Sequence, residues 1–251
     1  MPQLMRTSNP ALNDQAFRGE RAAFGGEAMT VQGTVNKTGI LLICCILTAA
    51  WTWNIYLHTH SPEAVGPLAL VGLIGGLIFA IATIFKKTWA PVTAPIYALL
   101  EGLVLGSVSA ILELRFPGIA IEAVSLTFGT LVVLLLAYKS GLIRVTDKLR
   151  LGIVAATGGI ALFYVVEMVL GLFHVHFLAV NGSGAIGIGF SVFVVIIAAL
   201  NLVLDFDFIE NAAHAGAPKY MEWYGAFGLM VTLIWLYFEI LRLLSKLRSR
   251  Q

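Results

Sequence analysis

Apolar residues fill most of this chain in seven long runs, which short polar segments separate. The runs cover approximately residues 38–57, 65–85, 91–113, 119–138, 151–173, 184–208 and 221–242. Each run is close to the ~20 residues that a helix needs to cross the ~30 Å hydrocarbon core of a bilayer. Lipid offers no partner to unpaired backbone amides, and the runs lack the two-residue alternation of barrel strands, so we expect helices. The pattern predicts an all-α membrane protein, a seven-transmembrane-helix bundle with short connections.

Polar segments at both ends frame this membrane domain. Residues 1–36 are polar and carry balanced charges, which predicts a disordered cytoplasmic leader. Residues 37–246 then form the predicted seven-helix membrane domain, and residues 247–251 form a basic tail. The lipid bilayer is therefore the first expected partner.

Composition narrows the class of protein further. Of the 251 residues, 59% are hydrophobic and only 12% are charged, whereas a soluble domain has about 25% charged residues. The formal net charge of +2 is too small to indicate a nucleic acid or another polyanion as a partner. No motif joins a nucleophile to a base at helical spacing, so we expect neither an enzyme nor a cofactor.

The basic residues are unevenly distributed among the predicted loops. If the N-terminus lies inside, the inside segments hold eleven of the 16 Lys and Arg residues, and the outside loops between helices hold only Arg115. This contrast predicts a cytoplasmic N-terminus in a bacterial-type inner or plasma membrane. Seven crossings place the C-terminus outside, although Arg242, Lys246, Arg248 and Arg250 are typical of an inside segment. A re-entrant last segment is the alternative.

Six carboxylic acids lie within or near the apolar runs, namely Glu101, Glu122, Glu167, Asp205, Asp207 and Glu239. A charged residue at the centre of a membrane helix costs roughly 2.5–3.5 kcal/mol on insertion scales. We expect these acids to face a wet interior, to stay protonated or to bind a cation. All three outcomes suit a proton-sensitive cation path. Interhelical hydrogen bonding by protonated acids is the purely structural alternative.

Helical spacing distinguishes the acids of the last two runs. Asp205 and Asp207 lie about 200° apart around a helix, so they cannot share a face. Asp205 is the buried candidate, and Asp207 lies closer to the inner interface. Glu239 and Arg242 are three residues apart and are expected to pair. Thr232 lies near the same face as Glu239 but about 10 Å away along the helix axis.

Three stretches of the chain carry a family resemblance. Residues 116–128 begin Phe-Pro-Gly-Ile, residues 189–209 run from Gly-Phe-Ser to Asp-Phe-Asp-Phe-Ile, and residues 229–244 end in Leu-Arg-Leu-Leu. In this order and spacing they resemble the Bax inhibitor-1 family, also called the YccA-like or transmembrane Bax-inhibitor-motif family. The resemblance covers roughly residues 38–246.

The resemblance implies a pH-sensitive calcium-leak pathway, in which aspartates on the sixth and seventh helices share a proton and latch the pore. Asp205 matches the sixth-helix aspartate, and Arg242 matches an arginine near the end of the seventh helix. Thr232 stands where the seventh-helix aspartate is expected. The family's acid on the second helix is also absent here, which leaves Glu239 and Glu101 as candidate substitutes.

We therefore expect a pH-sensitive cation (calcium) leak channel, or a regulator of ion homeostasis, of the Bax inhibitor-1 type. Ca²⁺ would be its permeant ion. The alternative is a non-conducting regulator that binds a membrane protease or another membrane protein. A small-solute transporter is a weaker alternative, because the sequence shows no convincing internal repeat. The expected proton or cation site consists of Asp205, Glu239 and Asp207, with Arg242, Glu101, Glu122, Glu167 and Thr232 in support.

Overall fold

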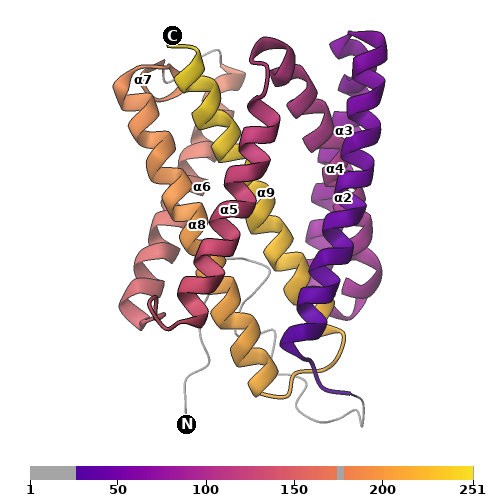
Figure 1. The fold of residues 1–251 in the computed structure, drawn as a ribbon, viewed down its shortest axis with the longest axis vertical. Coiled ribbons are helices and arrows are strands. Elements are labelled where there is room, and N and C mark those ends of the chain that lie inside the picture. Colours follow the sequence, from indigo (N-terminus) through magenta and orange to yellow (C-terminus); the bar gives the residue numbers. More distant parts are fainter. Residues whose placement is uncertain (1–26, 174–177, 251) are drawn as a thin grey trace.

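The computed structural model describes residues 27–173 and 178–250, which fold into a bundle of long helices (Figure 1). In this part of the chain, seven helices are long and apolar enough to cross a membrane, which confirms the predicted fold class. They are α2 (Val31–Thr59), α3 (Pro62–Phe85), α4 (Ala90–Arg115), α5 (Ile119–Lys139), α6 (Asp147–Leu172), α8 (Ala185–His214) and α9 (Met221–Arg248). The short helix η1 (Lys87–Trp89) leads into α4, and α7 (Leu178–Asn181) precedes α8.

Polar groups fix the positions at which several helices begin. The side chains of Thr30, Ser61 and Thr146 accept hydrogen bonds from backbone amides in the first turns of α2, α3 and α6. Such caps satisfy amides that a helix leaves without an internal partner. Before α5, Gly118 adopts a positive φ of 86°, which glycine tolerates best, and its amide donates to the Glu113 carboxylate.

Helix α9 runs through the centre of the bundle. Helices α2, α3 and α4 lie on one side of it and α6 and α8 on the other, and α5 crosses it in this view (Figure 1). Helices α8, α2, α5 and α4 all pack against α9, and the fully buried side chains of the core include Phe227 and Leu236 on α9 and Leu202 on α8. A residue on the inner faces of α8 and α9 is therefore shielded from lipid.

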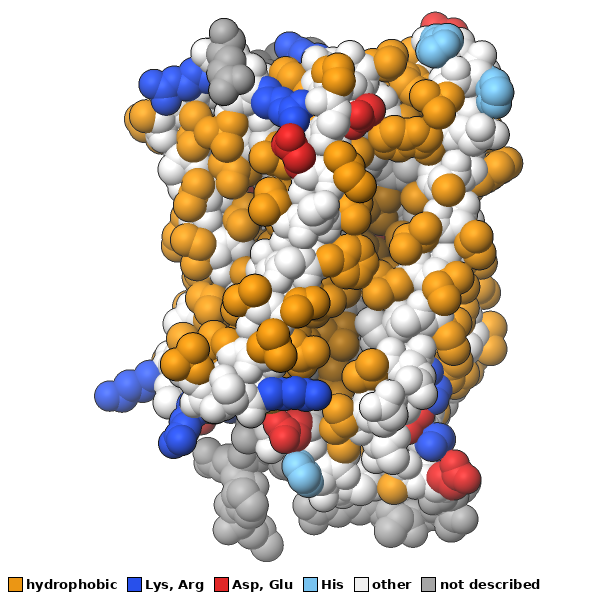
Figure 2. Space-filling model, in the orientation of Figure 1, with side chains coloured by type: hydrophobic (Ala, Val, Ile, Leu, Met, Phe, Trp, Pro, Cys, Tyr) orange, Lys and Arg blue, Asp and Glu red, His pale blue; other side chains and the backbone are white. Residues whose placement is uncertain are grey.

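Charged side chains gather at the two ends of the bundle, and a wide apolar band separates them (Figure 2). This is the surface of an integral membrane protein, with the band in the hydrocarbon and the charges at its borders. The first residue of α2 and the last residue of α9 lie at opposite ends (Figure 1). Helix α9 runs the length of the bundle and is long and apolar enough to cross a membrane, which favours a crossing over a re-entrant last segment (Figure 1).

The boundaries of the domain differ from those expected. Helix α2 begins at Val31, so residues 31–36 belong to the first helix rather than to a leader. Just before it, the Met29 amide donates to the Ala217 carbonyl at 2.7 Å, which attaches this segment to the α8–α9 loop. The remaining predicted leader, residues 1–26, lies outside the described residues. At the other end α9 continues to Arg248, so the expected basic tail is partly helical.

Candidate functional site

Asp205 of α8 and Thr232 of α9 meet inside the bundle. The Asp205 side chain is fully buried, and Thr232 is only 3% exposed. The Thr232 hydroxyl donates a hydrogen bond of 2.6 Å to Asp205 Oδ2, a length typical of a hydroxyl bound to a carboxylate. The structure therefore places Thr232 of α9 directly opposite Asp205 of α8.

Glu239 is a second buried carboxylate on α9, and it is only 3% exposed. The Tyr164 hydroxyl of α6 donates to Glu239 Oε1 at 2.9 Å. Arg242 Nη1 lies 3.4 Å from each Glu239 oxygen and also donates to the Tyr164 hydroxyl. The pair expected from three-residue spacing forms, and the half-exposed Arg242 connects the buried acid to the surface. Tyr164 was not among the expected site residues.

Glu222, in the first turn of α9, is a third buried carboxylate, and the sequence analysis missed it. It is fully buried, and its Oε1 accepts hydrogen bonds from the Thr30 amide at 2.9 Å and the Thr30 hydroxyl at 3.0 Å. Lys37 of α2 forms an ion pair with Glu222, and Lys219 Nζ lies 3.3 Å from it. An acid in a first helical turn is usually a solvated charge beside the helix dipole, so the position of Glu222 does not by itself indicate a buried site.

Lys219 shows that this end of the bundle is a small charge network. Its ammonium lies 3.3 Å from Glu27 Oε2 as well as from Glu222 Oε1. Hydrogen bonds to Glu27 and then to Glu222 raise the pKa of Lys219 above its ordinary value. Lys219 therefore remains charged at any physiological pH.

Asp207 faces a different helix from Asp205, as its two-residue spacing requires. Arg150 Nη2 of α6 lies 2.8 Å from Asp207 Oδ2, and the Asp207 side chain is 15% exposed. The side-chain amide of Asn211 donates a hydrogen bond of 2.6 Å to the Asp207 backbone carbonyl. Asp207 thus joins α8 to α6 at the end of the bundle where α8 finishes.

The supporting acids are dispersed over other helices. Glu101 of α4 lies against α3. Glu122 of α5 pairs with Arg248 at 2.6 Å, and Glu167 of α6 accepts a hydrogen bond from Asn181. Each of these three acids has its own neighbours, and none of those contacts involves Thr232. The prediction that they line one route with Asp205 remains a prediction.

The three buried carboxylates described above lie at successive levels along α9. Glu222 is at its start, Thr232 with Asp205 about 15 Å further on, and Glu239 about 10 Å beyond that at 1.5 Å per residue. Within the described ranges, no group of three or more His, Cys, Asp or Glu is placed to hold a metal ion. Tight Ca²⁺ binding takes six to eight oxygen ligands, and the three buried carboxylates lie too far apart along the bundle to supply them at one point.

The fold and this series of acids define a class, the seven-helix integral membrane proteins with buried carboxylates on their last two spanning helices. The family model described as "Bax inhibitor 1 like" matches residues 9–249, and the chain belongs to this family. This confirms the resemblance seen in the sequence and extends it towards the N-terminus. No curated protein and no solved structure matches the chain significantly.

Proposed function

We propose that this protein is a pH-sensitive cation channel that leaks calcium across its membrane, with the Asp205 carboxyl group as the proton-binding gate. One observation carries the proposal. The Asp205 carboxyl group is fully buried on the central helix pair, against a hydroxyl that donates to it, and it lies between the levels of two further buried carboxylates. Asp205 lies on α8 and the other two acids on α9, and a carboxyl group is expensive to bury unless it is paired, protonated or bound to a cation.

The pH dependence follows from competition for the same oxygen atoms. A proton neutralises the Asp205 carboxyl group, and a neutral carboxyl group attracts a cation weakly. When the proton leaves, the carboxylate attracts a divalent cation, and that cation offsets the cost of the buried charge. We therefore expect calcium flux to rise with pH as Asp205 ionises. Thr232 donates to Asp205 but is itself uncharged, so the Asp205–Thr232 contact contains one ionisable group rather than two.

Calcium flux into liposomes that contain the purified full chain and an enclosed calcium indicator tests this proposal. We expect wild-type flux to rise with pH, and Asp205→Asn to lower it about tenfold at the upper end, which corresponds to about 1.4 kcal/mol of lost cation stabilisation. The variant should also lose the pH dependence. Asp147→Asn is the matched control, because the Asp147 side chain is fully exposed, and it should behave as wild type.

Either of two outcomes would overturn the channel proposal. One is a wild-type flux no greater than that of empty liposomes at every pH. The other is an Asp205→Asn flux with the pH dependence of the wild type.

A second function, a non-conducting regulator that binds a membrane protease or another membrane protein, is favoured by Thr232. With threonine at this position, two carboxylates cannot share a proton between α8 and α9 as the family latch requires. This function predicts background calcium flux together with a stable complex with the partner. Deletion of residues 1–26 should then abolish the complex, and because it spares Thr30 and its contacts to Glu222, the bundle should stay folded.

A further inference from the structure

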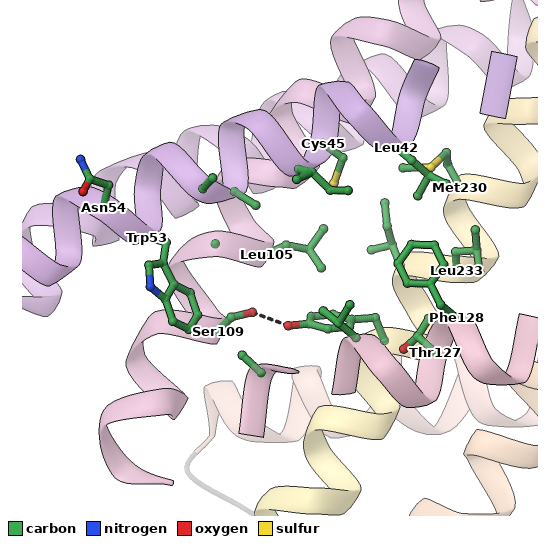
Figure 3. A pocket seen from close by; sticks show the side chains of 18 of the residues that line it. Leu42, Cys45, Trp53, Asn54, Leu105, Ser109, Thr127, Phe128, Met230 and Leu233 are labelled. Atoms are coloured by element: carbon green, nitrogen blue, oxygen red, sulfur yellow. Dashed lines mark hydrogen bonds between the residues drawn. The ribbon is translucent and has the colours of Figure 1, made fainter. Parts of the chain in front are cut away.

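An apolar groove lies between α2, α4, α5 and α9, away from the buried carboxylates. Its volume is about 580 Å³. Figure 3 shows Leu105 and Leu233 among the side chains that surround it, with Leu42 towards one end and Trp53 and Asn54 towards the other. The space-filling view shows a hollow, apolar region between the two sides of the bundle (Figure 2).

The walls of the groove are continuous helix faces. Along α2 the lining runs for four turns from Leu42 to Leu57, with a member every three or four residues. Along α9 it occupies one face over two turns, from Met230 to Tyr237. Helix α2 packs on α4 and α9, whereas the groove lies between it and α5 (Figure 3).

The hydroxyl groups of the walls form hydrogen bonds within the protein. The hydroxyls of Ser109 and Tyr237 form a hydrogen bond of 2.6 Å to one another, which Figure 3 shows as a dashed line. The Thr127 hydroxyl donates to the Ala123 carbonyl at 2.7 Å. Asn54 lines the groove only at its Trp53 end, where Figure 3 shows it. A water column needs two to four polar partners per molecule, so these walls favour an apolar occupant.

The groove opens onto the surface that lipid covers. Lining residues Ile46 on α2 and Phe128 on α5 are 55% and 37% exposed, and both belong to the apolar band around the molecule. The groove is therefore continuous with the lipid interface, where acyl chains are the solvent. An empty groove would leave its lining without dispersion contacts on one side, and an acyl chain restores them.

We propose that this groove binds one acyl chain of a membrane phospholipid, with the headgroup beside Trp53 and Asn54. From Leu42 to Leu57 the groove is about 22 Å long at 1.5 Å per residue, somewhat more than the depth of one leaflet of a ~30 Å core. Tryptophan is enriched at the headgroup level of membrane proteins, which places the polar end of the lipid at the Trp53 end. The bound chain contacts α9 over the two turns that separate Thr232 from Glu239. The proposal does not depend on conduction.

Photocrosslinking with a phospholipid that carries a diazirine in its acyl chain tests the proposal in nanodiscs of the full chain. After irradiation, mass spectrometry maps the lipid adducts. We expect them to concentrate on the groove faces of residues 42–57 and 120–128, at a density about fivefold above that of other lipid-facing helices. Ala50→Trp places an indole in the groove and should remove this excess, since Ala50 lines the groove and is itself exposed.

Ala155→Trp on α6 is the matched control, because Ala155 is also an exposed helical alanine but does not line the groove. It should leave the adduct map unchanged. Val124→Trp fills the groove from α5 and repeats the test independently of any folding defect in Ala50→Trp. Adducts spread evenly over all lipid-facing helices would overturn the proposal. So would an adduct map that Ala50→Trp and Val124→Trp both leave unchanged.

Discussion

At the scale of single residues, Glu222 shows how a fully buried carboxylate is held at the border of the membrane. It accepts two hydrogen bonds from Thr30 and pairs with Lys37 and Lys219. Burial of a charge is costly unless it is paired and hydrogen-bonded, and Glu222 is both. Because its partners come from the segment before α2, from α2 itself and from the α8–α9 loop, this one side chain holds three parts of the chain together.

We expect Glu222→Gln to lower the free energy of unfolding by about 2–3 kcal/mol, within the range for hydrogen bonds to charged groups. The amide would leave Lys37 without its charged partner. Thermal and denaturant unfolding in detergent micelles measure the change. Glu27→Gln is the control, since the Glu27 side chain is 83% exposed, and surface ion pairs contribute little. A Glu222→Gln protein as stable as Glu27→Gln would refute the assigned role.

The sequence predicts contacts within one helix more readily than contacts that depend on how two helices are rotated against each other. Glu239 and Arg242 share a helix, so their pairing follows from the helical period alone. The family register placed Thr232 opposite Asp205. The position of Tyr164 beside Glu239 depends on how α6 is rotated against α9, which no local pattern encodes.

The contacts of Lys246 are another example that the sequence does not predict. It was expected in a basic end segment facing water, yet it is only 7% exposed. Its ammonium donates to the carbonyls of Val180 and Gly187 and to the Ser191 hydroxyl. Three acceptors converge on this amino group and offset the cost of burying it. Those acceptors lie more than fifty residues away in the sequence, so the pattern around Lys246 gave no sign of them.

At the scale of helices, close packing of α2 against α4 depends on two glycines. Gly102 lies against Cys45 and Thr48 of α2, and Gly106 lies against Ala49 and Thr52. Lipid supplies no hydrophobic drive for helix association, so small residues that allow close approach of the backbones stabilise the contact.

A methyl group at Gly102 should force α2 and α4 apart. We expect Gly102→Ala to destabilise the protein by about 1–3 kcal/mol, the usual cost of overpacking. Gly129→Ala on α5 is the control, because a Cβ there meets nothing within 4 Å, and it should be neutral or slightly stabilising by helix propensity. Thermal unfolding of the two variants in the same detergent makes the comparison. Equal stability would contradict this account of the helix contact.

The existence of each helix could be read from the sequence, whereas the ends could not. An apolar run of about 20 residues without strand-like alternation forms a helix in lipid, so the sequence predicts all seven helices. Helix α9, for example, continues beyond its apolar run to Arg248. These extra turns lie at the polar border of the membrane. There the helix depends on ion pairs such as that of Arg248 with Glu122, which hydropathy does not register.

At the scale of the whole molecule, the charge distribution predicts one orientation. The end at which α2 begins also carries Lys86, Lys139, Arg144 and Lys148, which is the bias of a cytoplasmic face. The C-terminal end of α9 is basic too, but three of its basic side chains have partners within the protein. Arg242, Lys246 and Arg248 contact Glu239, Ser191 and Glu122 respectively. The contacts of these three basic residues therefore account for their presence, and their charge does not indicate which side of the membrane the C-terminus faces.

Single cysteines test this orientation in cells when Cys44 and Cys45 are first replaced by alanine. We expect a membrane-impermeant maleimide to label Ser249→Cys in intact cells, because Ser249 is exposed at the end of α9. Ser140→Cys, exposed at the end of α5, should react only after the membrane is permeabilised. Labelling of both positions from the same side, or in the reverse order, would contradict the predicted orientation.

The most direct test of the central claim is the pH dependence of calcium flux in liposomes with wild-type protein or Asp205→Asn. Asp205 is the buried acid that the structure places between α8 and α9, with Thr232 as its hydroxyl donor. We predict that wild-type flux rises with pH and that the Asp205→Asn flux is low and flat over the same series. Wild-type liposomes that admit no more calcium than empty ones, or two identical pH curves, would contradict it.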